Sequence, residues 1–206
     1  MEILFQQIER IKNKLNQLSE IDSRFVIFGS ERHKYKLNQV LSEEEIAEFE
    51  ETYSVSLPKD YRLYLQYIGN GGAGPYYGIE KLLDSLFEDL DYKKPNDKVN
   101  PSRPFPHTSL WNLDSSDFSS HEEYERTYFA KEHSNGILRL CNYGCGVSIN
   151  LVVNGSEYGN MWADDRGSDN GIIPWVGDNV ENNKERLNFL DWYESWLDES
   201  LEELKI

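Results

Sequence analysis

Residues 57–78 constrain the fold of this chain more than any other stretch, because a helical pattern runs directly into a glycine-rich segment. Pro58 suits the first turn of a helix, where its missing N–H costs nothing. Glycines within residues 69–74 can adopt the left-handed conformation of a helix C-cap, and Pro75 prevents the helix from restarting. The residues that recur at helical spacing and form one apolar face are Tyr61, Tyr64, Leu65 and Ile68.

A phosphate-binding loop is the alternative interpretation of the glycine-rich segment, and two features argue against it. No Lys-Ser or Lys-Thr pair follows the glycines, and the segment comes after a helix, whereas a phosphate loop precedes one. We therefore predict that residues 69–74 form a structural turn between a helix and a sheet.

The composition predicts an acidic protein of one domain. With 206 residues, the chain is long enough to bury a core of its own. Its formal net charge of −16 argues against direct binding to nucleic-acid phosphates or to anionic membranes, which attract Lys and Arg. Charge alone favours high solubility in the first place, and it is also compatible with a basic protein partner.

The chain also lacks the patterns of secreted and membrane proteins. Residues 1–7 do not form a basic segment followed by a long apolar run, so no secretory signal is expected. No stretch approaches the roughly 18 to 20 apolar residues that cross a bilayer. Two cysteines are too few for a disulfide scaffold. We expect a cytoplasmic protein with no membrane segment.

Two amphipathic helices are predicted before residue 57. The first is an N-terminal extension, residues 1–22, which precedes the main domain at residues 23–206; its apolar positions step by three and four and are Leu4, Ile8, Ile11, Leu15 and Leu18. We expect it to pack on the domain, a coiled coil being the alternative. The second spans residues 43–52, where Ser42 and Glu45 form a capping box. Between them, the apolar run 25–28 predicts a buried strand or turn.

Strand patterns are concentrated in the second half of the chain. Apolar runs at residues 136–141 and 146–153 predict two strands, and Asn154-Gly155 predicts a hairpin turn to a returning strand that ends near Asp164. Residues 163–171 are expected to form a polar loop before a last edge strand at 172–175. A closing helix is predicted from a broad apolar face formed by Phe189, Trp192, Tyr193, Trp196, Leu197, Leu201 and Leu204.

These elements predict an α+β fold: a single domain with a mainly antiparallel sheet packed by N-terminal helices and a C-terminal helix. Between the glycine-rich segment and the sheet, residues 79–90 are expected to form a short helix or turn. The proline-rich residues 91–106 are expected to form a loop or insertion, and residues 122–132 a further helix.

The candidate catalytic and metal-binding residues have stronger structural explanations. Cys145 lies between two glycines like a nucleophile at a tight turn, but no histidine is tied to it by spacing, and we expect Cys141 and Cys145 to be buried free thiols. Asp164, Asp165 and Asp169 could bind a divalent cation, but Arg166 lies among them and favours a solvated turn with an internal ion pair. The four histidines, His33, His107, His121 and His133, have no ligand spacing. We expect no catalytic residue, no metal and no cofactor.

Several motifs, taken in order, resemble those of the SUKH superfamily. The first are Leu41-Ser42-Glu43-Glu44-Glu45-Ile46, Leu57-Pro58-Lys59-Asp60-Tyr61-Arg62 and Asn70-Gly71-Gly72-Ala73-Gly74-Pro75. Further along come Leu151-Val152-Val153-Asn154-Gly155, Gly159-x-Met161-Trp162-x-Asp164-Asp165 and Phe189-Leu190-x-Trp192-Tyr193-x-x-Trp196-Leu197. The superfamily includes the fungal cell-wall-synthesis regulator domain and many bacterial immunity proteins. The helix within residues 1–18 and the stretch 95–106 are elaborations that the resemblance does not explain.

The resemblance implies a non-enzymatic binding protein. In bacteria such proteins neutralise a cognate toxin of a polymorphic or contact-dependent toxin system, often a nuclease, and the alternative is a regulatory scaffold that binds endogenous partners. A basic nuclease suits an acidic inhibitor physically, because opposite charges steer association. The expected partner is therefore a basic toxin, with no direct nucleic-acid or membrane binding. The expected contact residues, in loops, are Tyr76, Tyr77, Asp164 and Asp165; core packing is the alternative for the two tyrosines.

Overall fold

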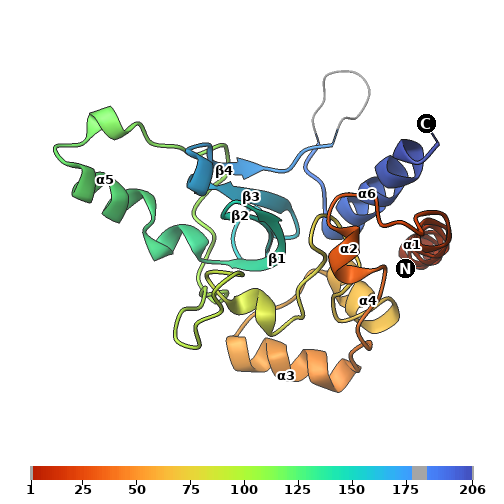
Figure 1. The fold of residues 1–206 in the computed structure, drawn as a ribbon. Coiled ribbons are helices and arrows are strands. Elements are labelled where there is room, and N and C mark those ends of the chain that lie inside the picture. The colour runs from red at the N-terminus through yellow and green to blue at the C-terminus, as the bar shows by residue number, and fades with distance from the viewer. Residues whose placement is uncertain (1, 178–184, 206) are drawn as a thin grey trace.

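Four antiparallel strands lie at the centre of the molecule, and their order in the sheet follows the chain (Figure 1). The computed structural model describes residues 2–177 and 185–205. The strands are β1 (Ile137–Gly144), β2 (Val147–Val152), β3 (Met161–Asp165) and β4 (Gly171–Pro174). Most residues of β1, β2 and β3 are buried whichever way they point, which means that both faces of the sheet are covered.

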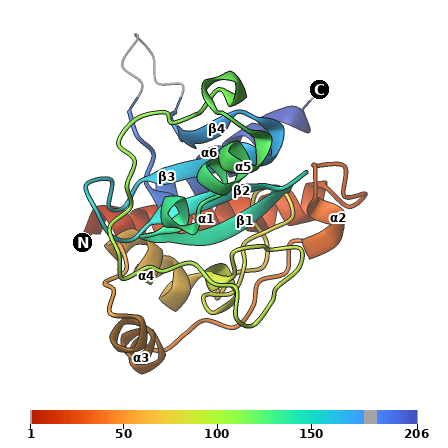
Figure 2. The same ribbon diagram turned by 90° about the vertical axis from the view of Figure 1, so that its left-hand side faces the viewer.

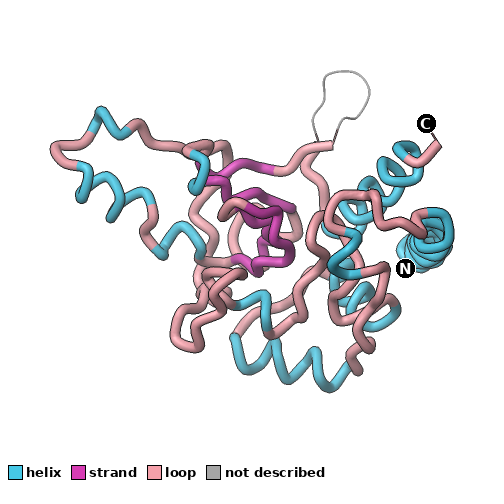
Figure 3. The backbone as a smooth tube through the Cα atoms, in the orientation of Figure 1, coloured by secondary structure: helices cyan, strands magenta, loops and turns pink. Residues whose placement is uncertain are grey.

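Helices cover the sheet mainly from one side. Within the described residues they are α1 (Glu2–Ile21), α2 (Ser30–His33), α3 (Glu43–Tyr53), α4 (Lys59–Tyr67), α5 (His121–Tyr128) and α6 (Phe189–Glu203). Figure 1 shows α1, α4 and α6 on one side of the strands and the arm that carries α5 on the other, and in Figure 2 α1 runs behind the sheet. Long loops join the compact elements (Figure 3). This is the predicted α+β fold with a single domain.

The helical pattern of residues 57–78 produces the aromatic part of the core. The four residues of the predicted apolar face, Tyr61, Tyr64, Leu65 and Ile68, are all buried. The Tyr61 and Tyr64 rings each lie 4.8 Å from the Phe189 ring of α6, in edge-to-face geometry that favours aromatic pairs. The stripe on α4 and the apolar face of α6 therefore bury each other.

The glycine-rich segment joins the N-terminal half of the chain to the sheet. Gly72 forms isolated β-bridges with Leu37 and Ile79, and Ile79 forms another with Cys141 of β1. The predicted left-handed C-cap is wrong in position: α4 ends with Ile68 in the right-handed conformation, and positive φ angles occur later, at Gly71 and Gly72. The glycines thus serve close backbone approach more than helix capping.

The tight hairpin turn lies one loop earlier than Asn154-Gly155 predicts. Strands β2 and β3 do pair antiparallel, but residues 153–160 connect them as a longer loop. Cys145 and Gly146, both with positive φ, form the two-residue turn between β1 and β2, where Gly144 pairs with Val147. Positive φ at both central residues is what a type I′ turn requires. The prediction of a tight turn at Asn154-Gly155 is therefore wrong, and the tight turn joins β1 to β2.

The structure decides one open prediction and corrects another. Of the strand or turn predicted for residues 25–28, the chain forms the turn, and only Ile27 is fully buried there, since Val26 and Phe28 are 60% and 56% exposed. Strand β3 continues through Asp165, a region predicted to be polar loop, because Asp164 and Asp165 pair with Ile172 and Gly171 of β4.

The N-terminal helix packs on the domain. Its predicted apolar positions Ile8, Ile11, Leu15 and Leu18 are buried, and on its flank Gln7 donates to Asp191 of α6 at 2.8 Å. Arg10 and Lys14 pair with Glu194 of the same helix. The proposed division into residues 1–22 and 23–206 stays a prediction, and residues 1, 178–184 and 206 lie outside the described part of the chain.

Candidate functional site

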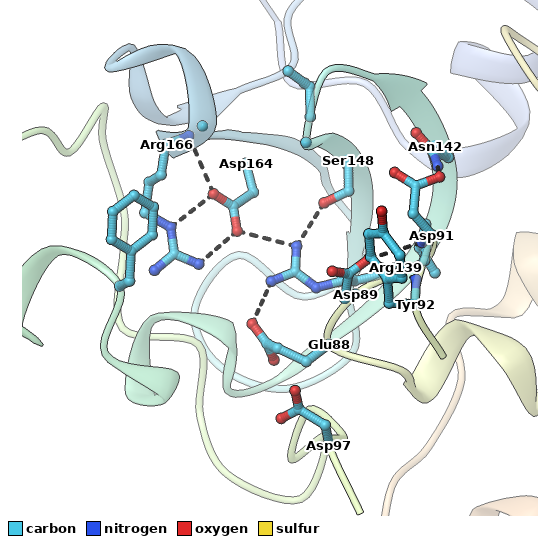
Figure 4. Close-up of a pocket in the computed structure, with 15 residues that line it drawn as sticks. Glu88, Asp89, Asp91, Tyr92, Asp97, Arg139, Asn142, Ser148, Asp164 and Arg166 are labelled. Carbon is cyan, nitrogen blue, oxygen red and sulfur yellow. Dashed lines mark hydrogen bonds and ion pairs between the residues drawn. The ribbon is translucent and has the colours of Figure 1, made fainter. Parts of the chain in front are cut away.

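A cavity of about 540 Å³ opens beside the sheet (Figure 4). Its wall is formed by β1, β2, β3, Glu88 and the short helical turn η4 (Arg166–Ser168), and its rim by residues 89–97. The rim includes the start of the proline-rich stretch that was predicted to be a loop. Residues 91–106 contain neither a helix nor a strand, and Asp91, Tyr92 and Asp97 of this insertion line the charged cavity.

Two arginines share one aspartate in the wall of the cavity. Arg139 of β1 donates from Nη1 to Asp164 Oδ2 at 3.0 Å and from Nη2 to Glu88 Oε1 at 2.6 Å. Arg166 donates to both oxygens of Asp164, at 2.7 Å from Nε and 2.6 Å from Nη2. Ser148 and Ser134 add hydroxyl partners to Arg139. Figure 4 shows Arg139 and Arg166 on either side of Asp164, with Ser148 and Glu88 at the Arg139 guanidinium group.

This geometry fixes the charges of the site. Burial alone would raise the pKa of Asp164, but the hydrogen bonds and positive charges of Arg166 and Arg139 hold it well below its usual range. Burial opposes the charged form of Arg139, yet Asp164 and Glu88 raise its pKa. Because neither Asp164 nor Arg139 exchanges a proton near neutral pH, the network suits binding and support better than general acid–base catalysis.

The rim carries acidic side chains that face the cavity with fewer partners. Asp89 Oδ1 accepts from the main-chain N–H groups of Asp91 and Tyr92, at 2.8 and 3.0 Å. Asp91 Oδ1 accepts from Asn142 Nδ2 at 2.7 Å, and Asp97 pairs with Lys131. These contacts hold the loop against β1 and leave carboxylate oxygens at the opening.

The predicted contact residues fall into two separate places. Asp164 is buried in the strand and engaged by two arginines, which is an internal ion pair of the kind predicted for this segment but not a solvated loop. Asp165 is half-buried, and its Oδ2 accepts from Asn170 at 2.7 Å. The structure tests neither residue as a partner contact.

Tyr76 and Tyr77 belong instead to an aromatic cluster near the β1–β2 turn. The Tyr76 ring lies 4.3 Å from Tyr143, and the Tyr77 ring lies 5.4 Å from Phe28. Both tyrosines are half-buried, whereas Tyr143 and Phe28 are exposed by 43% and 56%. We call these four residues, Phe28, Tyr76, Tyr77 and Tyr143, the aromatic cluster. Tyr76 and Tyr77 therefore pack against neighbouring rings and also leave part of each side chain exposed to solvent.

Sequence reasoning missed Arg139 and Glu88, although one signal was present. Arg139 interrupts the otherwise apolar run from Ile137 to Cys141, and a charge inside a buried strand needs a partner. Nothing in the local sequence identifies that partner, because Glu88 and Asp164 are far away along the chain. The sequence could therefore predict a buried ion pair but not its members.

The cysteines and histidines are also placed by the fold. Cys141 is buried, and burial raises the pKa of its thiol well above the ordinary value. Cys145 is exposed at the β1–β2 turn, so the expectation of two buried thiols is wrong for this residue. His107 Nε2 and His133 Nδ1 lie 3.2 Å apart, although their spacing predicts no pairing. Among the described residues no group of three or more potential ligands could hold a metal ion.

None of the helices in the described ranges combines the length and apolar character needed to cross a bilayer.

Comparisons with known proteins identify the family. No curated protein and no solved structure matches the chain. A sequence model of the SMI1 / KNR4 family (SUKH-1) matches residues 40–198, which is most of the chain and includes α3, α4, the cavity and all four strands. The chain therefore belongs to the SMI1 / KNR4 family (SUKH-1).

Proposed function

We propose that this protein is a non-enzymatic immunity protein that binds and neutralises a cognate bacterial toxin in the cytoplasm of the producing cell. Family membership supports an immunity-like or regulatory protein. The observation that carries the proposal is the charged cavity, where buried guanidinium and carboxylate groups neutralise one another in a fixed arrangement beneath an acidic rim. Such an arrangement supports recognition of a basic surface.

The net charge of −16 supports a basic partner, and a toxic nuclease is one candidate. A nuclease needs a positive surface to hold phosphates, and an acidic protein can occupy that surface. Long-range attraction would also speed the encounter, which matters for a protein that must intercept a toxin before damage accumulates. Neither a metal nor a cofactor is part of this proposal.

The proposed contact surface combines the aromatic cluster with acidic residues around the cavity. Tyr76 and Tyr77 offer large side chains that lose little entropy on binding, a property typical of interface residues. Asp164 contributes through Arg139 and Arg166, whose positions it holds, whereas half-buried Asp165 could contact the partner itself.

The test is co-expression with the toxin domain encoded beside the gene of this protein. We expect cells that make both proteins to survive, and the two to elute as one complex in gel filtration. Death of the cells without complex formation would contradict the proposal. If no toxin is encoded nearby and several housekeeping proteins co-purify with the chain, the regulatory scaffold is the correct function.

The contribution of the aromatic cluster is measured with a matched pair of variants. Tyr77→Ala removes a cluster residue, and Tyr158→Ala removes a 46%-exposed tyrosine from the loop between β2 and β3. We expect Tyr77→Ala to weaken the complex by about 2 kcal/mol and Tyr158→Ala by less than about 0.5 kcal/mol. Equal effects would remove Tyr77 from the proposed interface.

A further inference from the structure

The charges that line the cavity do not balance. Five carboxyl groups and two guanidinium groups line it, and Lys131 from outside the lining pairs with one of the five, Asp97. Asp164 is fully engaged by Arg139 and Arg166, but no described salt bridge involves Asp89 or Asp91. The cavity as a whole is therefore negative, and an anionic ligand would meet uncompensated carboxylates at its entrance.

Two buried polar atoms in the wall lack hydrogen-bond partners among the residues that the structure describes. Arg139 is only 5% exposed, yet its Nε has no acceptor. Glu88 Oε2 is buried and has no donor, although Oε1 of the same carboxylate binds Arg139 and Ser134. A buried donor and a buried acceptor without partners are costly, and both belong to residues that line the cavity.

The remaining wall is apolar enough to cover an aliphatic stem. Tyr92, Phe129 and Val147 line the cavity beside the charged groups, and Tyr92 and Phe129 are 72% and 51% exposed. Lysine and arginine bury their methylene groups against such surfaces while the charged end reaches polar partners. The volume of about 540 Å³ lies within the usual range of ligand pockets.

We propose that this cavity receives a lysine or arginine residue of the protein partner. The methylene stem lies against Tyr92 and Phe129, and the ammonium or guanidinium group meets Asp89 and Asp91 at the entrance, on the side of the cavity where Glu88 carries its unpartnered oxygen. This inference rests on the proposed function, because the basic residue belongs to the protein partner proposed there. A basic residue neutralises part of the excess negative charge and brings donors towards the carboxylate of Glu88.

The chemistry is tested without the partner, by NMR titration of the full chain. The probe is Nα-acetyl-arginine N-methylamide, which carries a guanidinium group and main-chain carbonyls. Its control, Nα-acetyl-norleucine N-methylamide, has the same main chain and no charge. We expect saturable shifts at Arg139, Ser148 and the loop 89–97 with the arginine probe only. Equal binding of both probes, no binding, or shifts confined to other regions would overturn the proposal.

Two charge-matched variants identify the site. Asp89→Asn with Asp91→Asn keeps the side-chain oxygens that accept the loop hydrogen bonds but removes both charges. Glu48→Gln with Glu51→Gln removes two charges from the exposed side of α3. We expect the first double variant to bind the arginine probe about tenfold more weakly and the second to bind like the wild type. Equal weakening would reduce the effect to net charge and overturn the proposal.

The same variants separate this inference from the proposed function. If the wild type protects cells from the toxin and the Asp89→Asn, Asp91→Asn variant binds the toxin as tightly, the cavity proposal fails and the function stands. If the wild type does not protect cells but binds the arginine probe in the cavity, the proposed toxin fails and the cation site stands.

Discussion

At the scale of single residues, the central feature is a buried network in which every charge depends on another. Asp164 lies between two guanidinium groups, and Arg139 reaches from there to Glu88. Buried ion pairs are not necessarily stabilising relative to apolar residues, but removal of one member leaves the others uncompensated. The network therefore fixes the shape of the cavity wall.

Replacement of Asp164 by Asn tests this dependence. We expect Asp164→Asn to lower the free energy of unfolding by about 3 to 5 kcal/mol, because it leaves Arg139 and Arg166 buried with one fewer anion. Urea unfolding followed by tryptophan fluorescence measures the change at pH 7. The half-buried neighbour provides the control: Asp165→Asn is expected to change stability by about 0.5 kcal/mol or less. Similar losses in the two variants would contradict the role of Asp164.

The histidine pair predicts how stability depends on pH. Burial, with further contributions from His133 and Arg166, lowers the pKa of His107 to about 4. An unfolded histidine has a pKa near about 6.5. The folded state therefore binds fewer protons, so this contribution to stability is complete above about pH 6.5 and is lost as the pH falls towards 4. His33, whose pKa burial also lowers to about 4, acts in the same direction.

We expect the free energy of unfolding to decrease between pH 7 and pH 4.5, with about 2 kcal/mol of the decrease due to His107. Urea unfolding at a series of pH values measures it. His107→Gln should flatten the profile, whereas His121→Gln should leave its slope unchanged, because the His121 side chain is 78% exposed. A profile that His107→Gln does not alter would show that another group governs the dependence.

At the scale of elements, the glycine-rich segment acts as a joint between the helices and the sheet. A Cβ atom added at Gly71 would lie 2.5 Å from the carbonyl oxygens of Ile79 and Glu80, and the φ angle of Gly71 is positive. Gly72 is similarly limited by the Lys36 carbonyl oxygen, at 2.4 Å. Backbone from three parts of the chain meets here, so the glycines are required by contact and conformation together.

Comparison of two alanine substitutions separates contact from conformation. Gly71→Ala combines positive φ with a backbone clash and should destabilise the protein by more than about 2 kcal/mol. Gly159→Ala has positive φ, but no atom lies within 4 Å of the added Cβ, so it should cost about 1 kcal/mol. Thermal unfolding of both variants gives the difference. Equal costs would mean that conformation alone explains the glycine at 71.

The N-terminal helix makes a second prediction at this scale, because it lies outside the residues matched to the family. Ile11 is completely buried, and Ile11→Ala should destabilise the domain by about 2 to 4 kcal/mol if α1 belongs to the same cooperative unit. Urea unfolding should remain a single transition. Lys12→Ala, on the outer face of α1, is the control and should have little effect. A separate early transition would identify α1 as an independent extension.

At the scale of the whole molecule, the excess of acidic residues affects association with other molecules more than it affects the fold. Opposite charges accelerate association, and salt screens them over about 8 Å at physiological ionic strength. For the complex with the proposed toxin, we expect the association rate constant to fall by at least about tenfold between 50 and 500 mM NaCl. The dissociation rate constant should change much less. Surface plasmon resonance measures both, and a salt-independent association rate would argue against a basic partner.

Local patterns were sufficient where neighbours in the sequence determine the structure. The capping box of Ser42 and Glu45 forms as predicted, and the predicted apolar face of α4 is buried. The predicted face of the closing helix is buried as far as Leu197, whereas Leu201 and Leu204 are half-buried. The α+β class followed from the same periodicities. The hairpin turn was misplaced because Asn154-Gly155 and Cys145-Gly146 are both compatible with positive φ, and only strand pairing selects between them.

The sequence by itself determined the fold class, the helical faces, the acidic character and the family resemblance, because each depends on composition or on neighbours within a few turns. Only the tertiary structure decided that Glu88, Arg139 and Asp164 meet in one cavity wall, and that Tyr76 packs against Tyr143. Long loops separate these residues along the chain, and the length of a loop does not determine which part of the fold the chain reaches after it. The three charged residues depend on one another because a charge that is buried away from water needs a nearby opposite charge, wherever that residue lies in the sequence.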